Sequence, residues 1–284
     1  MEEIAIDRLL QFLKDDLFFI DVTTEAMIPK NCRARAIVVA EDRGIVAGNN
    51  FVVPFLKYFG IDVIRYVEDG GYIDIGDIVL ELMGEARKIL SIERTILNFL
   101  MILSGIATYT KSIVERVREI NSRLIIAATR KTHPGLAFFE KYAVSVGGGS
   151  THRLGLFDTV LIKDNHLAIV GDVRKAVELA RKTLGYFKKI EVEVRSAEEA
   201  LEAAKAGADI VMLDNMSVEE VAKAIELLRL HGLRDRVLIE VSGGIDEDSI
   251  AEYAKLDVDI VSLSKLTLEA PPLKMSMDVV EVIL

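Results

Sequence analysis

Polar clusters follow the apolar segments in the second half of the sequence, and they carry the side chains that could do chemistry. Four cations come from three of these clusters, and together they could bind one multiply charged anion, since guanidinium groups pair with carboxylates through two hydrogen bonds. Any one of them alone would be an ordinary surface charge, so the prediction depends on their convergence. The four are Arg130, Lys131, Arg153 and Lys163.

Carboxylates at strand ends form the second chemical feature. Glu191 and Glu193 alternate with apolar residues, so both would point into a barrel if the neighbouring valines face outer helices. Asp214 ends the following apolar segment. Inward carboxylates are costly unless a cation or metal pairs with them. This pattern indicates a Mg²⁺ or sugar-hydroxyl site, and the alternative is a structural ion-pair network with the four cations.

A glycine turn supplies a third feature. Ser242, Gly243 and Gly244 follow a strand and precede a predicted helix, so backbone N–H groups could approach a phosphate. The preceding Glu240 has the same strand parity as Ser242. The alternative is an ordinary helix start, because the acidic residues 246–248 suit a first turn and would oppose a phosphate that faced them.

Charge is unevenly distributed along the chain. The net charge of −10 disfavours a nucleic-acid-binding protein. Residues 121–166, however, contain six basic against three acidic residues, and three of the four histidines. This indicates a pocket for a small anion. Because His133, His152 and His166 lack the H-x-x-x-H spacing of zinc ligands, we expect them to form hydrogen bonds without a metal.

Strand and helix patterns alternate from residue 124 onward, which predicts a parallel barrel or doubly wound sheet. In such α/β folds ligands bind at the carboxyl ends of the strands, where the polar clusters lie. The predicted strands are 124–129, 142–146, 159–162, 190–194, 210–213, 237–241 and 260–263. The predicted helices are 172–184, 197–206, 218–230 and 247–256, with Gly207 as a helix stop.

The first part of the chain has a different pattern. Residues 35–40 are rich in β-formers, and 69–71 indicate a hairpin turn between two short strands. Apolar spacing predicts helices over 4–18 and 91–120, the latter interrupted at Gly105, and a final strand over 274–284 that pairs with the first domain.

Composition bounds the class of protein. The 284 residues fit about two domains. The one cysteine, Cys32, excludes an internal disulfide and fits a reducing compartment. The acidic N-terminus is unlike a signal peptide, and the most apolar stretch, 99–103, is far shorter than a membrane span. We therefore expect a soluble cytoplasmic protein.

Several sequence motifs together resemble the quinolinate phosphoribosyltransferase family, which is also called nicotinate-nucleotide pyrophosphorylase (carboxylating). The resemblance runs from Asp21 to the C-terminal strand. It implies an α/β fold with an N-terminal open-faced sandwich, residues 1–107 joined by 270–284, and an incomplete seven-stranded barrel, residues 108–269. The motifs are 93–99, 103–108, 129–135, 140–144, 147–149, 152–153 and 160–166.

The resemblance also implies roles for individual residues. Lys131, Lys163, Glu193 and Asp214 would be catalytic, the last two binding Mg²⁺ through water or substrate. Arg94 would reach the site of a partner subunit, so a homodimer with shared active sites is implied, or a hexamer of such dimers. The substrate-binding set comprises Arg94, Thr129, Arg130, Lys131, His152, Arg153, Lys163, Glu193, Asp214, Ser242, Gly243, Gly244 and Ser264.

Five positions depart from the family pattern. Ser264 stands where glycine is usual and Leu268 where histidine is frequent, which puts phosphate contacts in doubt. Residues 150–151 replace the usual Val/Thr-Asn, and His133 replaces threonine.

The implied activity is transfer of phosphoribose from phosphoribosyl pyrophosphate to quinolinate with decarboxylation, a step of NAD biosynthesis that requires Mg²⁺ and neither nucleic acid nor membrane. Three alternatives remain. They are a paralogous phosphoribosyltransferase with another acceptor, a Schiff-base aldolase using Lys163, and a non-enzymatic anion-binding barrel.

Overall fold

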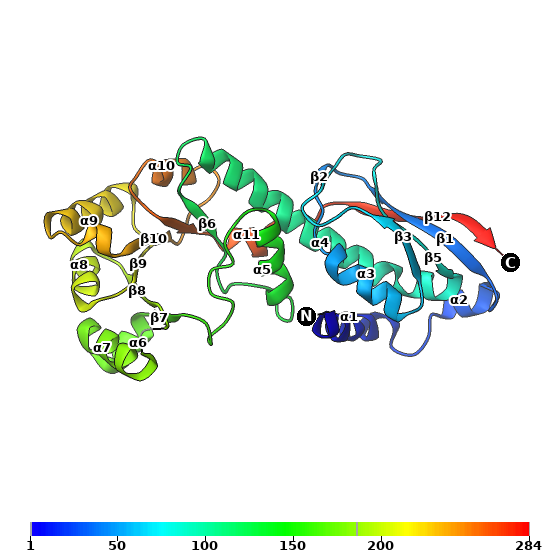
Figure 1. Cartoon of the computed structure of the whole chain (residues 1–284), viewed down its shortest axis with the longest axis horizontal. Helices are drawn as coiled ribbons and strands as arrows, with labels where there is room; N and C mark the ends of the chain where they lie inside the picture. The colour runs from blue at the N-terminus through cyan, green and yellow to red at the C-terminus, as the bar shows by residue number, and fades with distance from the viewer. Residues whose placement is uncertain (1, 186, 284) are drawn as a thin grey trace. The chain divides into compact units, whose positions relative to one another are not determined.

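The structure is a computed structural model that describes residues 2–185 and 187–283, and it divides into two units (Figure 1). Unit 1 comprises Met1–Lys111, Ser145–Gly147 and Ala270–Leu284, and unit 2 comprises Ser112–Val144 and Gly148–Glu269. Of the predicted domain ends, residues 1 and 284 lie outside the described residues.

A four-stranded antiparallel sheet with the order β12-β1-β5-β3 forms the centre of unit 1. Alternate residues of β1 are buried on one face, and the others are half-buried or exposed, as in an open-faced sandwich. The predicted pairing of the C-terminal segment with the first domain is confirmed, because β12 lies antiparallel to β1. The strands are β1 (Arg33–Ala40), β3 (Asp62–Tyr66), β5 (Ile78–Glu85) and β12 (Met275–Ile283).

The hairpin predicted at 69–71 is wrong. The strand before the turn, β3, pairs with β5, whereas β4 (Tyr72–Ile73) pairs with β2 (Gly44–Ile45). Asp69 explains the difference, because its carboxylate Oδ1 accepts hydrogen bonds from the backbone N–H groups of Gly48 and Asn49 at 3.0 and 2.8 Å. The turn therefore closes over the start of a helix and does not join two paired strands.

Helices lie beside this sheet in Figure 1. The predicted N-terminal and long central helices are confirmed, but the predicted interruption at Gly105 is wrong. The helix runs through Gly105, where a Cβ would collide with the backbone carbonyl oxygen of Pro271. Glycine thus permits close packing at this position. The helices are α1 (Glu2–Leu17), α2 (Val22–Met27), α3 (Asn49–Tyr58) and α4 (Ala86–Arg118).

Helix α4 is long and apolar enough to cross a membrane by length and composition alone. However, 61% of its most apolar window is buried inside the protein. Ile92, Ile96, Leu100 and Leu103 are among its buried residues. This burial is typical of the core helix of a soluble protein.

Unit 2 contains a six-stranded parallel sheet with the order β6-β11-β10-β9-β8-β7. The two end strands of this order, β6 and β7, do not pair with each other in the described residues, so the barrel is incomplete. The strands are β6 (Ile125–Ala127), β7 (Val160–Ile162), β8 (Ile190–Val194), β9 (Ile210–Asp214), β10 (Leu238–Ser242) and β11 (Ile260–Ser262).

The helices of unit 2 alternate with its strands. Three of the four predicted helices have the expected bounds within one residue, and their N-caps are side chains that accept hydrogen bonds from the first turn, as in Asp172, Ser196 and Ser217. Gly207 ends its helix with φ +89°, as predicted. The helices are α5 (Ala137–Val146), α6 (Asp164–Val170), α7 (Val173–Leu184), α8 (Ala197–Ala206), α9 (Val218–Leu230), α10 (Ile250–Ala254) and α11 (Lys265–Leu268), with a 3₁₀ turn at Arg234–Arg236.

Six strands, not seven, make up the sheet of unit 2. The strand predicted over 142–146 is wrong, because these residues form the second half of α5. Burial of Phe139, Glu140, Ala143 and Val144 recurs with helical spacing, which a short apolar run does not reveal. Apart from its pairing with β11, strand β6 forms only a single parallel bridge in the described part of the chain, between Ala127 and Ser150.

Candidate active site

A cavity of about 360 Å³ lies at the carboxyl ends of the strands of unit 2. Eleven of the thirteen predicted site residues line it, so the convergence expected from the polar clusters is found. These eleven are Thr129, Arg130, Lys131, His152, Arg153, Lys163, Glu193, Asp214, Ser242, Gly243 and Gly244. The other lining residues are Ala128, Leu161, Met212, Asn215, Glu240 and Ser262.

Two predicted site residues do not line this cavity. Arg94 is exposed on α4 in unit 1. Ser264 is the N-cap of α11, and its carbonyl oxygen accepts hydrogen bonds from the Leu268 N–H at 3.0 Å and the Thr267 hydroxyl at 3.2 Å. The Thr267 hydroxyl also lies 2.7 Å from the carbonyl oxygen of Lys131. Thr267 therefore connects Ser264 with Lys131, a residue of the cavity lining.

The cations of the cavity differ in how the chain holds them. Arg130 and Lys131 are exposed, and within residues 2–185 and 187–283 neither forms an ion pair. Arg153 is buried, donates to the carbonyl oxygen of Thr159 at 3.2 Å, and has a pKa lowered mainly by that burial. Lys163 Nζ contacts Glu193 Oε2 at 2.8 Å. The cavity thus presents unpaired positive charge, which suits an anionic ligand.

A buried ammonium group shapes the loop that carries His152. Lys141 is 1% exposed, and its Nζ donates hydrogen bonds to the carbonyl oxygens of Thr151 at 2.5 Å and Arg153 at 2.8 Å. These two residues flank His152, whose φ of +51° is unusual for a residue with a side chain. Burial lowers the pKa of Lys141 to about 8. Lys141 therefore holds both sides of a strained backbone position.

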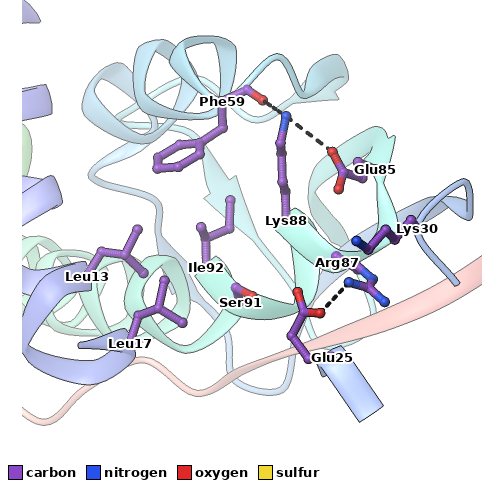
Figure 2. Close-up of a pocket in the computed structure, with 10 residues that line it drawn as sticks. All are labelled: Leu13, Leu17, Glu25, Lys30, Phe59, Glu85, Arg87, Lys88, Ser91 and Ile92. Carbon is purple, nitrogen blue, oxygen red and sulfur yellow. Dashed lines mark hydrogen bonds and ion pairs between the residues drawn. The ribbon is translucent and has the colours of Figure 1, made fainter. Parts of the chain in front are cut away.

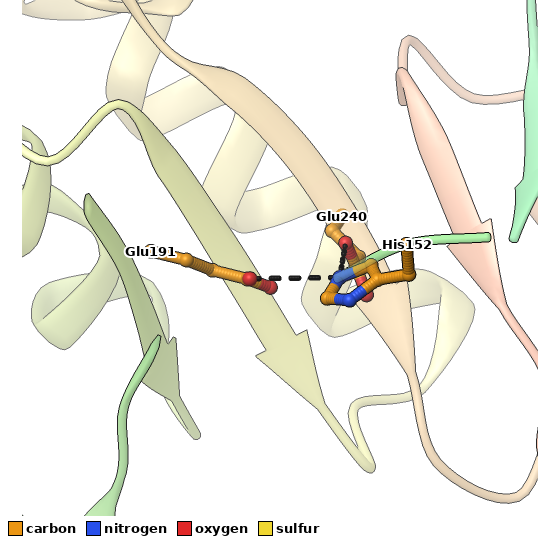
Figure 3. A group of neighbouring side chains, drawn as sticks. All are labelled: His152, Glu191 and Glu240. Carbon is orange, nitrogen blue, oxygen red and sulfur yellow. Dashed lines mark hydrogen bonds and ion pairs between the residues drawn. The ribbon is translucent and has the colours of Figure 1, made fainter. Parts of the chain in front are cut away.

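His152 lies between two buried carboxylates (Figure 3). Its Nε2–H donates to Glu240 Oε2 at 3.0 Å and lies 3.5 Å from Glu191 Oε2. Burial disfavours the charged ring, but the neighbouring carboxylates of Glu191 and Glu240 outweigh it and raise the pKa of His152 to about 9. Burial likewise raises the pKa of Glu191. His152 therefore carries a positive charge at neutral pH.

These three residues could also hold a metal ion. Their ligand atoms all lie within 4.8 Å of one another, and the Glu191 oxygens have no hydrogen-bond partner. A metal bound there would replace the hydrogen bond between His152 and Glu240.

The other two histidines of the basic segment lie outside the cavity. His133 Nδ1 contacts Glu140 Oε1 at 2.6 Å, and burial raises the pKa of Glu140. His166 Nδ1 accepts a hydrogen bond from the Lys163 backbone N–H at 3.0 Å. Both histidines are therefore engaged in local hydrogen bonds, as expected from the absence of zinc-ligand spacing.

The predicted Mg²⁺ ligands stand at the ends of neighbouring strands. Glu193 on β8 and Asp214 at the end of β9 both line the cavity. Asp214 Oδ2 accepts a hydrogen bond from Asn215 Nδ2 at 2.8 Å and lies 3.8 Å from Arg195 Nε. Both carboxylates thus combine a neighbouring donor with access to the cavity, a setting that suits sugar hydroxyls or a hydrated cation.

The glycine turn forms the remaining wall. Gly243 and Gly244 have φ values of +89° and +65°, and a Cβ at Gly243 would lie 2.5 Å from Asn215 Oδ1. The helix predicted from residue 247 begins only at Ile250, because Asp246 and Ser249 close a turn in which the Asp246 carboxylate accepts the Ser249 hydroxyl at 2.8 Å. The phosphate donors available here are therefore backbone N–H groups of the turn.

A second cavity, of about 440 Å³, lies in unit 1 (Figure 2). Two of its basic side chains, Arg87 and Lys88, form ion pairs with carboxylates of the same unit. Arg87 contacts the carboxylate of Glu25 at 2.6 Å, and Lys88 contacts Glu85 at 3.3 Å and the carbonyl oxygen of Phe59 at 3.2 Å. The cavity of unit 2 therefore fits an anionic ligand better.

Comparison with known protein families shows the family to which the chain belongs. Residues 21–104 match the model of the quinolinate phosphoribosyl transferase N-terminal domain, and residues 106–278 match that of the C-terminal domain. The chain belongs to the quinolinate phosphoribosyltransferase family. The predicted family and α/β fold class are thus confirmed.

Individual relatives agree over almost the whole chain. A protein of Methanothermobacter thermautotrophicus named "probable nicotinate-nucleotide pyrophosphorylase (carboxylating)" is 46% identical, covering 96% of this chain and 98% of its own. The nicotinate-nucleotide pyrophosphorylase (carboxylating) of Mycobacterium leprae is 38% identical over 93% of each chain. The solved structure of NadC from Streptococcus pyogenes is 39% identical, with a TM-score of 0.89 over 100% of this chain and 98% of that one.

The site predicted from the sequence lacks three polar residues that line this cavity, Asn215, Glu240 and Ser262. Glu240 was noticed for its parity but left out of the predicted site, and Ser262 was not considered as a buried group. The signal was available for both, because inward parity on β10 places Glu240 with Ser242, and pairing of β10 with β11 sets Ser262 beside Ser242.

Proposed function

We propose that the protein transfers the phosphoribosyl group of phosphoribosyl pyrophosphate to quinolinate, with loss of CO₂, to form nicotinate mononucleotide and pyrophosphate in NAD biosynthesis. The supporting observation is the single cavity in which unpaired cations, two accessible carboxylates and a glycine turn meet. The relatives named above carry this activity in their names. Membership of their family gives no support to the aldolase or the non-enzymatic alternative.

The cationic wall would bind the acceptor. Quinolinate carries two carboxylates, and Arg130, His152 and Arg153 offer fixed or protonated donors to them. Arg153 is held by Thr159, and His152 by Glu240, so both would meet the substrate already oriented. Thr129 supports this wall, since its hydroxyl oxygen accepts the Lys131 backbone N–H at 3.0 Å.

The opposite wall would bind phosphoribosyl pyrophosphate. Glu193 and Asp214 would contact the ribose hydroxyls and Mg²⁺, and the backbone N–H groups of the turn at Ser242, Gly243 and Gly244 would hold the 5′-phosphate. The donor chemistry fits magnesium, which prefers carboxylate oxygen and substrate phosphate. When bound, the ion would neutralise charge on the pyrophosphate.

The chain's own residues would assist each bond change. The ring nitrogen of quinolinate attacks C1 of the ribose as the C1–O bond to pyrophosphate breaks, and Glu193 and Asp214 stabilise the positive charge that develops on the sugar. Lys131 and Lys163 stabilise the leaving pyrophosphate. The resulting pyridinium accepts the electron pair of the C2–carboxylate bond as CO₂ leaves, and the ring carbon then takes a proton.

We further propose a cytoplasmic homodimer in which Arg94 completes the site of the partner subunit, with a hexamer as the larger assembly. The domain division would follow residues 1–107 with 270–284, and 108–269. Arg94 is exposed on α4 and does not line the cavity of unit 2. A role for Arg94 in a partner's site is consistent with this position.

An acceptor comparison tests the proposed function. Purified protein with phosphoribosyl pyrophosphate and Mg²⁺ is expected to form nicotinate mononucleotide from quinolinate and none from nicotinate, and chelation is expected to abolish the product. Product from nicotinate, or pyrophosphate release with a different acceptor only, would move the protein to the paralogue with another acceptor.

Replacing Arg130 with alanine tests the acceptor wall. Because Arg130 is exposed and pairs with no described carboxylate, the chain should fold normally while the quinolinate KM rises about tenfold or more through loss of a charged hydrogen bond. The matched control is Arg123→Ala, an exposed arginine just before β6, which should leave the KM unchanged. Normal quinolinate affinity in Arg130→Ala would contradict the assignment.

A further inference from the structure

A chain of hydrogen bonds crosses the floor of the cavity from His152 to the glycine turn. His152 Nε2–H contacts Glu240 Oε2 at 3.0 Å, Ser262 Oγ lies 2.6 Å from Glu240 Oε1, and Ser262 Oγ lies 3.0 Å from Ser242 Oγ. Glu240 is fully buried and Ser262 is 3% exposed. The Glu240 carboxylate thus connects the wall proposed to bind quinolinate with the wall proposed to bind the 5′-phosphate.

The hydroxyl protons of this chain can be assigned from the contacts of Ser262. Ser262 has a single hydroxyl proton, and its short contact with the Glu240 carboxylate takes that proton, because hydrogen bonds to ionised acceptors are the stronger ones. The contact between the two serines must then be donated by Ser242. The Ser242 hydroxyl consequently points its proton inward, and only lone pairs of its oxygen face the cavity.

A phosphate cannot use those lone pairs. Its oxygens are acceptors, so an inward-donating Ser242 hydroxyl contributes nothing to a phosphate until its bond to Ser262 breaks. The backbone N–H groups of Gly243 and Gly244, held by positive φ values, remain as donors. Ser242 therefore serves the hydrogen-bond chain, and the glycine backbone serves the phosphate.

We propose that Glu240 and Ser262 are positioning residues that orient His152 toward the acceptor and withhold the Ser242 hydroxyl proton from the phosphate. This inference rests on the proposed function and refines it, since it assigns different work to the two ends of one polar chain. It predicts that breaking this hydrogen-bond chain weakens the binding of quinolinate without weakening the binding of the phosphate group. A merely structural role would weaken the binding of both substrates together.

Ser262→Ala is the decisive variant. It removes the Glu240 donor and the Ser242 acceptor at once, so the quinolinate KM should rise about tenfold while the phosphoribosyl pyrophosphate KM stays the same or falls, because the Ser242 hydroxyl is released to the phosphate. Ser262→Thr keeps the hydroxyl and should restore the quinolinate KM to within about threefold of the original.

Two further variants examine the ends of the chain. In Glu240→Gln the amide oxygen can still accept a hydrogen bond from His152, but the negative charge beside the imidazole is lost, so the quinolinate KM should rise. Ser242→Ala should change the phosphoribosyl pyrophosphate KM less than about threefold, whereas a hydroxyl that donated to the phosphate would cost about tenfold or more. The matched control is Ser217→Ala, a helix cap outside the cavity, which should lower Tm and leave both KM values unchanged.

Steady-state kinetics of these variants in the full-length protein separate the outcomes. Opposite or unequal movement of the two KM values in Ser262→Ala, with rescue by threonine, supports the proposal. A parallel rise of both, or a rise confined to phosphoribosyl pyrophosphate, overturns it while leaving the proposed function intact. A wild-type protein that forms no nicotinate mononucleotide contradicts the proposed function, and calorimetric titration of quinolinate into Ser262→Ala then tests the His152 end without turnover.

Discussion

Lys163→Met is expected to lower kcat by about 10²- to 10³-fold, the range found when a preorganised charge is removed from an active site. Lys163 Nζ lies 2.8 Å from Glu193 Oε2 at the carboxyl ends of β7 and β8. Methionine keeps most of the side-chain volume but removes the charge, so the leaving pyrophosphate loses a cation and Glu193 loses its partner. Single-turnover measurement of nicotinate mononucleotide formation would show the loss in the chemical step.

The control for this variant is another lysine of the same sheet. Lys189 pairs with Asp209 at 3.2 Å at the opposite end of β8, far from the cavity lining. Lys189→Met removes a comparable ion pair and should leave kcat unchanged. A kcat for Lys163→Met within about threefold of the wild type would show that this lysine stabilises no reacting group.

Gly243→Ala is expected to lower kcat/KM for phosphoribosyl pyrophosphate by about a hundredfold, as a displacement of about 1 Å in a binding group can do. A Cβ at this position would lie 2.5 Å from Asn215 Oδ1, and the backbone φ of +89° is itself unfavourable for alanine. The turn must therefore shift, and with it the N–H groups proposed to bind the 5′-phosphate. The quinolinate Kd, measured by calorimetry without the second substrate, should change little.

Gly232→Ala separates the collision from the backbone strain. Gly232 also has a positive φ, +66°, but a Cβ there would meet no atom within 4 Å. Its substitution should cost stability of about 1 kcal/mol or somewhat more and leave kcat/KM unchanged. Equal kinetic losses in the two variants would show that general destabilisation, and not the phosphate turn, is responsible.

The strands that carry the site could be predicted well because their side chains alternate. Strand parity predicts that Glu193 on β8 points inward, and Glu193 lines the cavity. The same rule gives Glu240 the parity of Ser242 on β10, and the pairing of β10 with β11 sets Ser262 beside Ser242. The polar chain itself could not be predicted, since it depends on which hydroxyl lies within hydrogen-bond distance of which carboxylate.

Tertiary contacts explain the errors in the fold. Residues 142–146 form an apolar run whose period does not separate strand from helix, and their helical state depends on the buried face of α5. The sequence predicts a hairpin at 69–71, but the Asp69 carboxylate binds the start of α3. It also predicts a helix break at Gly105, whose missing Cβ instead makes room for Pro271. Each case was decided by a partner distant in sequence.

The most direct test of the proposed reaction is its stoichiometry. Full-length protein is incubated with Mg²⁺, phosphoribosyl pyrophosphate and quinolinate labelled in its 2-carboxylate, and labelled CO₂, nicotinate mononucleotide and pyrophosphate are measured together. The proposed mechanism predicts equal amounts of all three, and no pyrophosphate when quinolinate is left out. Pyrophosphate released without labelled CO₂, or labelled CO₂ formed without the mononucleotide, would contradict phosphoribosyl transfer to quinolinate in this cavity.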